Sequence, residues 1–521
     1  MPAADQFLRA VDASRRWLLA AAAVLLLASF SPYWRITPDS ALFLGVARNL
    51  ALGQGFTFNE QTVTSINAGF PYLLAAIRPL ASDPIIAGNV LMLALGLVSL
   101  AFVYLLMLRN AGRPLAVLVT LLTAVNGTFL RHSCEILADI PFFFCSTLAL
   151  LGYELTFAIV RPKQPTNSPT DPRLAGDSQA QNPARNPAFI FLAALLVLLG
   201  LAGMASLRIV VLGPLAAILV DLLWRIRRSR FKWAVIAGAS GVLLVALAIR
   251  LADPRMAGGF KLLGKERELL EMFQNLPAMA SRIATFTAAE LFTEVTPRAI
   301  FGNKIGLWPL DVLVSLAVIA AGGMLFRRRL AWGLLVAIYF VQWLLIFPDT
   351  RYFLPILPLL ILGWWDLAVR LSMQTSPRWQ RPILVTLVAL IAVPNAVRSI
   401  GFAIEQHKRP FEARYLRGRF QDLPEFAARI REALPADAIV LTSGQFAGPL
   451  HYFSGVRTIP TVGATLPIPL PPGRPIFVLL PGEAELDPAL TSLGFARSSE
   501  IISGPPRGKG TLSLLSTRPL P

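Results

Sequence analysis

Charged residues are scarce in this chain of 521 residues. They make up 15% of the sequence, against about 25% in an ordinary soluble domain. Hydrophobic residues make up 55%, and the mean hydropathy is +0.60. Most of the chain therefore does not pack around soluble cores, and a water-soluble protein is excluded. The chain must lie in lipid.

Cysteine and histidine are also rare. The two cysteines, Cys134 and Cys145, lie in or beside one apolar stretch without metal-site spacing, which excludes a disulfide framework or a zinc module. Three histidines argue against a His-rich metal site. The formal charge of +18 comes from short basic clusters between apolar runs, a pattern that indicates membrane topology and no nucleic-acid partner.

Long apolar runs are what the sequence has instead. A span needs about 20 residues, and about eleven such runs are present. They lie near 17–35, 84–108, 114–131, 135–160, 187–205, 207–224, 233–251, 305–326, 330–347, 352–370 and 383–400. The first run, Trp17–Trp34, follows Arg15 and Arg16 and is alternatively a cleaved signal sequence.

Basic residues then orient these spans. With a cytoplasmic N-terminus, every second connection is basic, as in Arg327–Arg329, which the positive-inside rule requires of cytoplasmic loops. The loops 36–83 and 252–304 and the tail 401–521 then lie on the outer face. We expect a multi-pass protein of a bacterial inner membrane.

Two domains are expected. Residues 1–400 form a multi-span catalytic domain whose outer loops 36–83 and 252–304 build the site, with a disordered cytoplasmic loop at 161–186. Residues 401–521 form a small extracytoplasmic α/β domain. Its expected elements are a helix from Asp422 to Leu434, strands Ala438–Thr442, Pro475–Leu480 and Leu512–Ser516, and a helix near Glu483–Leu493. The fold class is thus an all-α polytopic membrane protein with a C-terminal α/β domain.

Asp39 is the first candidate site residue. It directly precedes an apolar-periodic helix, Ala41–Ala51, after the first span. A carboxylate there is either the N-cap of that helix or a general base at the membrane boundary that takes a proton from a hydroxyl acceptor.

Glu135 and Asp139 form a second acidic group, four residues apart and on one face if helical. Such a pair shares a proton, binds a divalent cation, or pairs with a base such as Arg131 or His132. Alternatively, Glu135 lies in a wet loop and Asp139 is a satisfied polar group.

Two arginines, Arg208 and Arg351, lie at outer helix ends. A guanidinium matches phosphate oxygens and stays charged when partly buried, although a single arginine at a membrane edge also reaches toward lipid headgroups. Asp221 with Arg225 and Asp366 with Arg370 are expected to be structural i,i+4 pairs at cytoplasmic ends.

Several segments together resemble the GT-C class of membrane glycosyltransferases, particularly bacterial relatives of protein O-mannosyltransferases and of the lipid A aminoarabinose transferase. They are the acidic first loop Pro38–Gly55, Glu135–Pro141, Ser206–Arg208, Arg351–Pro358 and Tyr452–Gly455. One departure is Asn67-Ala-Gly-Phe-Pro71, where relatives often carry a Lys or His before a Pro-Pro-Leu turn.

The resemblance implies an inverting, mannosyltransferase-like hexosyltransferase. Its donor is a sugar on a polyprenyl phosphate, and its acceptor is a hydroxyl of a protein, lipid or glycan. By that resemblance Asp39 is the base and Asp139 the second catalytic acid, while Glu135, Arg208, Arg351 and Tyr352 bind substrate, with a divalent cation at Glu135 and Asp139 left open. The alternative is a transporter or flippase of lipid-linked saccharides, which also needs a lipid groove and arginines for phosphate.

Overall fold

The computed structural model describes residues 2–64, 66–160, 187–208, 211–226, 308–345, 350–408, 423–461, 474–481, 496–497 and 512–516. Contacts divide the chain into two units. The first comprises Met1–Phe30, Met92–Ser133 and Ala138–Ile404, and the second comprises Ser31–Leu91, Cys134–Leu137 and Glu405–Pro521. The C-terminal domain expected from the sequence therefore shares a unit with the loop that follows the first span. The expected loops at 161–186 and 252–304 lie outside the described residues.

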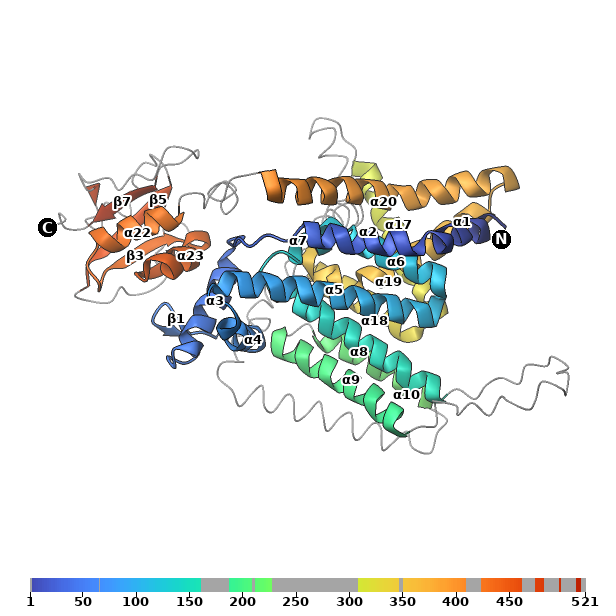
Figure 1. Ribbon diagram of the computed structural model, residues 1–521, viewed down its shortest axis with the longest axis horizontal. Helices are drawn as coiled ribbons and strands as arrows, with labels where there is room; N and C mark the ends of the chain where they lie inside the picture. The colour runs from blue at the N-terminus through green and yellow to red at the C-terminus, as the bar shows by residue number, and fades with distance from the viewer. Residues whose placement is uncertain are drawn as a thin grey trace. The chain divides into compact units, whose positions relative to one another are not determined.

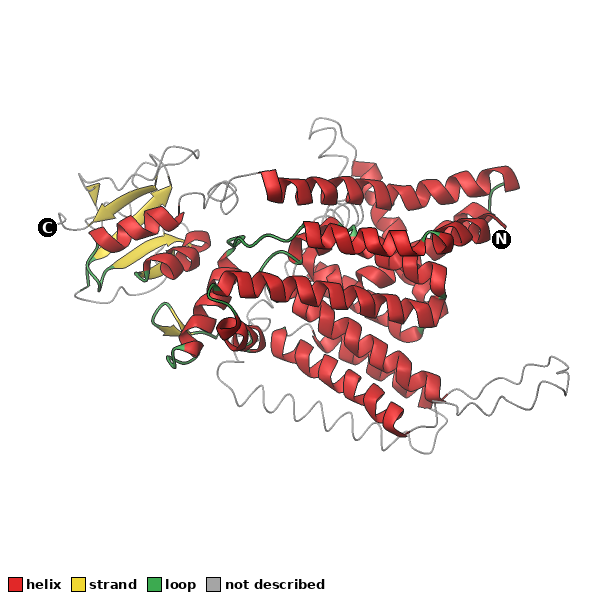
Figure 2. Cartoon of the chain, viewed as in Figure 1, coloured by secondary structure: helices red, strands yellow, loops and turns green. Residues whose placement is uncertain are grey.

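The first unit is a bundle of helices (Figures 1 and 2). Its helices, some continuing into the second unit, are α1 (Pro2–Ala13), α2 (Arg15–Ala28), α5 (Pro84–Ala111), α6 (Arg113–Ala124), α7 (Gly127–His132), α8 (Asp139–Val160), α9 (Pro187–Leu207), α10 (Leu212–Ile226), α17 (Trp308–Arg328), α18 (Leu330–Leu345), α19 (Leu357–Met373) and α20 (Pro377–Lys408). A 3-10 segment, η7 (Thr350–Ile356), precedes α19.

Three helical stretches of the described residues are long and apolar enough to cross a membrane, Pro84–Ala111, Arg351–Met373 and Pro377–His407. Helix α20 turns large apolar side chains outward, including Leu390, Val393 and Val397. Outward apolar side chains on so long a helix are typical of a lipid-facing surface. The total of about eleven spans stays a prediction.

Small residues allow α8 and α9 to pack closely, side by side in Figure 1. A Cβ added at Gly152 would lie 2.8 Å from the Cβ of Leu196, and one added at Gly200 would lie 2.7 Å from the Cβ of Ala149. Within a membrane the hydrophobic effect does not bring helices together, because lipid is as apolar as their side chains. The van der Waals packing that this close approach of backbones allows therefore drives helix association.

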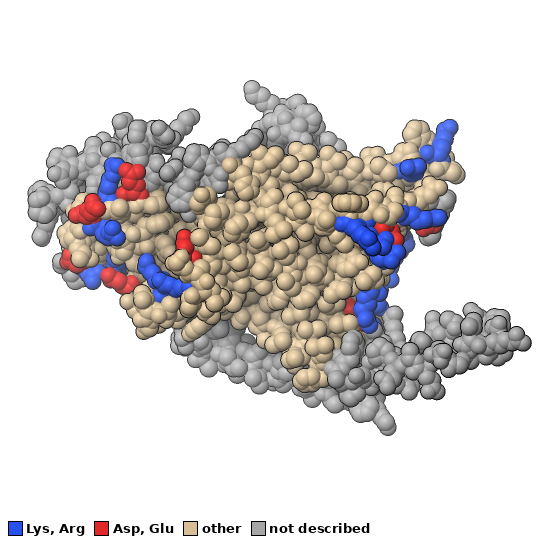
Figure 3. Space-filling view, viewed as in Figure 1, with Lys and Arg blue, Asp and Glu red and all other residues tan. Residues whose placement is uncertain are grey.

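A cluster of charged side chains lies at one end of the bundle. On the face shown in Figure 3, most of the bundle is uncharged, and Lys, Arg, Asp and Glu collect over the end where α1 lies. Ion pairs join the helices there: Arg113 with Asp12 at 2.6 Å and Arg328 with Asp366 at 2.5 Å. The expected Asp366–Arg370 pair is therefore wrong, because Arg328 of α17 takes the carboxylate.

The second unit contains two parts that are distant in sequence. The N-terminal part has α3 (Pro38–Ala51), a hairpin of β1 (Thr57–Phe58) and β2 (Gln61–Thr62), α4 (Gly69–Ile77) and η1 (Arg78–Leu80). The C-terminal part has α22 (Leu423–Ala433), β3 (Ile439–Ser443), α23 (Gly444–Ser454), β4 (Arg457–Thr461), β5 (Ile476–Pro481), β6 (Ala496–Arg497) and β7 (Leu512–Ser516).

The C-terminal strands form one mixed sheet in the order β4-β3-β5-β7-β6. Strand β3 pairs in parallel with β4 and β5, whereas β7 is antiparallel to β5 and β6. Buried apolar side chains such as Phe426, Ile430 and Phe477 join α22 to the sheet. The expected helix and the three expected strands are present within a residue or two of their expected bounds, and the helix near Glu483–Leu493 lies outside the described residues.

Candidate active site

Asp139 and Arg208 form a buried ion pair in the helical unit. Arg208 Nη2 lies 2.7 Å from Asp139 Oδ1, and the side chains are 16% and 1% exposed respectively. Asp139 is the first residue of α8, where the positive end of the helix dipole favours a carboxylate. Arg208 directly follows α9. The close packing of α8 and α9 thus brings together two charges 69 positions apart.

Tyr352 of η7 lies between two guanidinium groups. The Cζ atom of Arg208 is 4.8 Å from the centroid of the Tyr352 ring, and that of Arg351 is 5.3 Å from it. Both distances are within the range of a cation–π interaction. The Tyr352 ring therefore contacts both guanidinium groups.

These residues line one small pocket, together with Phe142 and Pro355. The lining carries two guanidiniums and one carboxylate, so its side chains sum to one positive charge. An arginine-lined pocket with an apolar wall suits a phosphate group attached to a hydrocarbon. Of the predicted site residues, Asp139, Arg208, Arg351 and Tyr352 thus come together. Phe142 was missed in the sequence, although it lies one helical turn after Asp139.

Asp39 belongs to the second unit, in the first turn of α3. The N-cap of that helix is Thr37, whose hydroxyl accepts a hydrogen bond from the Ser40 N–H, while Ser40 Oγ accepts from the Thr37 N–H in return. The interpretation of Asp39 as the N-cap is therefore wrong, because this reciprocal capping box already occupies the position. The role of Asp39 as a base stays a prediction.

Glu135 also belongs to the second unit, in the non-helical stretch between α7 and α8, where it is 3% exposed. It is not on the helix that Asp139 begins, so the two acids do not share a helix face. Asp139 pairs with Arg208 rather than with the neighbouring Arg131 or His132. In the described ranges, no group of three or more His, Cys, Asp or Glu side chains gathers in one place.

The fold is that of the GT-C class of membrane glycosyltransferases. The chain is similar to two structures of ArnT from Cupriavidus metallidurans. One is bound to undecaprenyl phosphate (TM-score 0.53, 12% identity) and the other is in the apo state (TM-score 0.51, 11% identity), and each covers 96% of this chain and 97% of the ArnT chain.

An archaeal oligosaccharyltransferase, AglB from Archaeoglobus fulgidus, gives a TM-score of 0.47 at 12% identity, over 85% of this chain and 64% of its own. The sequence matches no family model and no curated protein.

Proposed function

We propose that this chain transfers one sugar from a polyprenyl-phosphate donor to a hydroxyl acceptor, with inversion at the anomeric carbon. The observation that carries the proposal is the pocket in which Asp139, Arg208, Arg351 and Tyr352 meet on a GT-C fold. The ArnT structure bound to undecaprenyl phosphate supports a lipid-linked donor. The basic clusters support a bacterial inner membrane, with the site at the exported face.

In this mechanism the bond between the anomeric carbon and the phosphate oxygen breaks, and the electron pair leaves with polyprenyl phosphate. Negative charge grows on the phosphate, where Arg208 and Arg351 stabilise it in place. Asp139 orients Arg208 through their ion pair. Asp39 takes the proton of the acceptor hydroxyl, a contribution of about 10²–10⁴-fold, while the hydroxyl oxygen bonds to the opposite face of the anomeric carbon.

The test is reconstitution in liposomes with an undecaprenyl-phosphate-linked hexose and mass spectrometry of the lipids and acceptors. We expect the native protein to form a covalent glycoside and to release undecaprenyl phosphate. Arg208→Gln and Arg351→Gln should form neither product. Arg109→Gln is the matched control, since Arg109 is exposed at the end of α5. Donor that crosses the bilayer without a covalent product would identify a flippase and overturn the proposal.

The role of Asp39 is tested separately with Asp39→Asn. We expect this variant to insert and to bind donor normally, and to lose transfer. Full activity in Asp39→Asn would remove Asp39 from the mechanism without touching the phosphate pocket.

A further inference from the structure

The β1–β2 hairpin has an unusual turn. Thr57 pairs with Thr62 and Phe58 with Gln61, so the turn consists of Asn59 and Glu60. Both have left-handed backbones, with φ of 56° and 62°. Hairpin turns of this kind favour Asn-Gly, since glycine adopts positive φ without strain. Glutamate at the second position costs stability, so local turn chemistry does not explain why Glu60 is there.

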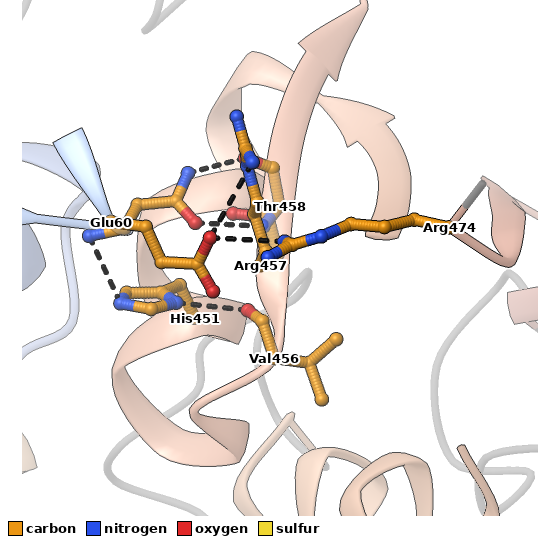
Figure 4. A network of polar contacts seen from close by, with 7 residues as sticks. Glu60, His451, Val456, Arg457, Thr458 and Arg474 are labelled. Carbon is orange, nitrogen blue, oxygen red and sulfur yellow. Dashed lines mark hydrogen bonds and ion pairs between the residues drawn. The ribbon is translucent and has the colours of Figure 1, made fainter. Parts of the chain in front are cut away.

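The side chain of Glu60 reaches the C-terminal part of the unit (Figure 4). Its Oε2 lies 3.4 Å from Arg457 Nη1 and 3.0 Å from Arg474 Nη1. Strand β4, which begins at Arg457, is at the edge of the sheet. Glu60, with its left-handed backbone, thus makes both ion pairs, one to the edge strand and one to the segment that precedes β5 (Ile476–Pro481).

Asn59 binds the same edge. Its side-chain amide donates to the Thr458 carbonyl, and its Oδ1 accepts from the Thr458 N–H at 2.8 Å. The Asn59 backbone N–H donates to Nε2 of His451, 3.1 Å away. The side chain of Asn59 therefore pairs with the edge strand as a neighbouring strand would. We call Asn59, Glu60, His451, Arg457, Thr458 and Arg474 the turn clasp.

The turn clasp is continuous with α3. The Phe58 ring stands edge-on to His451, with centroids 4.7 Å apart, and packs against Gly45 of α3. Arg48 of α3 donates to the Tyr452 carbonyl at 3.3 Å. At the other end of α3, a Cβ added at Gly448 of α23 would lie 3.5 Å from the Pro38 carbonyl oxygen, one residue before Asp39. The turn is therefore joined through contiguous contacts to the helix that carries Asp39.

We propose that the C-terminal domain is a positioning module, and that the turn clasp holds α3, and with it Asp39, in the reactive orientation. This inference rests on the proposed glycosyl transfer. The clasp residues are positioning residues and do not touch substrate.

The decisive variant is Glu60→Gly in the full-length protein. Glycine relieves the positive-φ strain, so a merely local role predicts an unchanged or steadier hairpin. Loss of docking instead predicts a fall in kcat of at least tenfold with an unchanged KM for the donor, since small misplacements of a catalytic group are costly. Gln61→Ala is the matched control, because Gln61 is exposed on the same hairpin and should keep native kcat. A native kcat in Glu60→Gly overturns the proposal.

His451 adds a second readout. Its Nδ1 bonds the Val456 carbonyl at 2.8 Å, so Nδ1 carries the proton and Nε2 accepts from Asn59. Protonation would set two N–H groups against each other. The charged groups that act on His451 are Arg48 and Glu60. We expect kcat to fall at acid pH, as His451 becomes protonated. The variant His451→Gln, whose side-chain oxygen still accepts from Asn59, should lose this acid dependence. The same acid limb in His451→Gln contradicts the clasp.

Hydrogen exchange separates this proposal from the proposed function. Glu60→Gly should accelerate amide exchange in α3, whether or not any sugar is transferred, and Gln61→Ala should not. If the native protein forms no glycoside, the proposed function fails and the exchange still decides the clasp. Unchanged α3 exchange in Glu60→Gly shows that the clasp does not hold the helix.

Discussion

The Asp139–Arg208 pair allows a quantitative test by double-mutant cycle. Arg208→Gln leaves the Asp139 carboxylate charged and nearly fully buried, and breaking a buried pair by removing one partner costs about 3–5 kcal/mol. Asp139→Asn leaves the charge on Arg208, which is more exposed, so its cost should be nearer the lower limit. With both changes no uncompensated charge remains.

The double variant should therefore cost much less than the sum of the single ones. Two unit charges 4 Å apart attract by about 4 kcal/mol at an effective dielectric constant of 20, which bounds the coupling. Desolvation of both groups reduces it, and we expect about 2–3 kcal/mol, at the upper end for residues in contact. The measurement is the free energy of unfolding in mixed micelles for all four proteins.

The Asp12–Arg113 pair is the control, with a similar N–O distance of 2.6 Å but with Arg113 53% exposed. Its coupling should be much smaller, because water screens it. If the costs of Asp139→Asn and Arg208→Gln add within about 0.5 kcal/mol, the pair is not a buried electrostatic unit. The double variant should be less destabilised than the two single costs add up to, and it should not transfer sugar. Native sugar transfer by the double variant would show that the ion pair stabilises the position of α8 and has no part in the reaction.

Three further outcomes are expected. Tyr352→Leu removes the ring that contacts both guanidiniums and should weaken binding of undecaprenyl phosphate several-fold, since a cation–π interaction is worth about 0.5–2 kcal/mol. Tyr352→Phe keeps the ring and should bind normally. Equal binding by both variants would refute the role of the Tyr352 ring. Gly45→Ala should destabilise the protein by about 1–3 kcal/mol, because the added Cβ would overlap the Phe58 ring. Gly401→Ala is the control, since a Cβ there meets open space, and it should be neutral or slightly stabilising. Equal melting temperatures of the two variants would contradict this packing. Burial lowers the pKa of His451 below its ordinary 6.5, so between the two pKa values only the unfolded chain binds the proton. The free energy of unfolding should therefore fall as pH is lowered through that window, by at most about 1.4 kcal/mol per pH unit. A His451→Gln protein with the same pH dependence of unfolding would exclude His451 as the cause.

The charged residues of this pocket could be singled out in the sequence because they carry charge where charge is expensive. Asp139, Arg208 and Arg351 stand at the ends of apolar runs, and such groups persist only with a partner or a task. Which partner each charge takes was predictable only in part. Asp221 pairs with Arg225 as expected, but Asp366 faces Arg328 on another helix rather than Arg370 on its own, since helix packing as well as spacing decides which charges meet.

Helix caps and turns decided how much of the remaining local structure could be predicted from the sequence. Asp39 is preceded by Thr37-Pro38, and the Thr37–Ser40 box identifies the true N-cap, a signal that was present in the sequence. Asn59 and Glu60 give no such signal, because their partners lie 392 to 414 positions away. Helix α23 and strand β4 were also missed. Pro449 lies inside the helix and Pro460 inside the strand, and proline argues against either element.

The sheet edge at β4 has a consequence for work on the isolated C-terminal domain. In the whole chain, the outward N–H and C=O of Thr458 are satisfied by Asn59. A fragment starting near residue 405 would leave the edge of β4 without these hydrogen bonds. Arg457 and Arg474 would also lose their ion pairs with Glu60. An open strand with unmet hydrogen bonds recruits other strands. Such a fragment should self-associate edge to edge, and a soluble version would need the hairpin supplied as a peptide or fused in front of it.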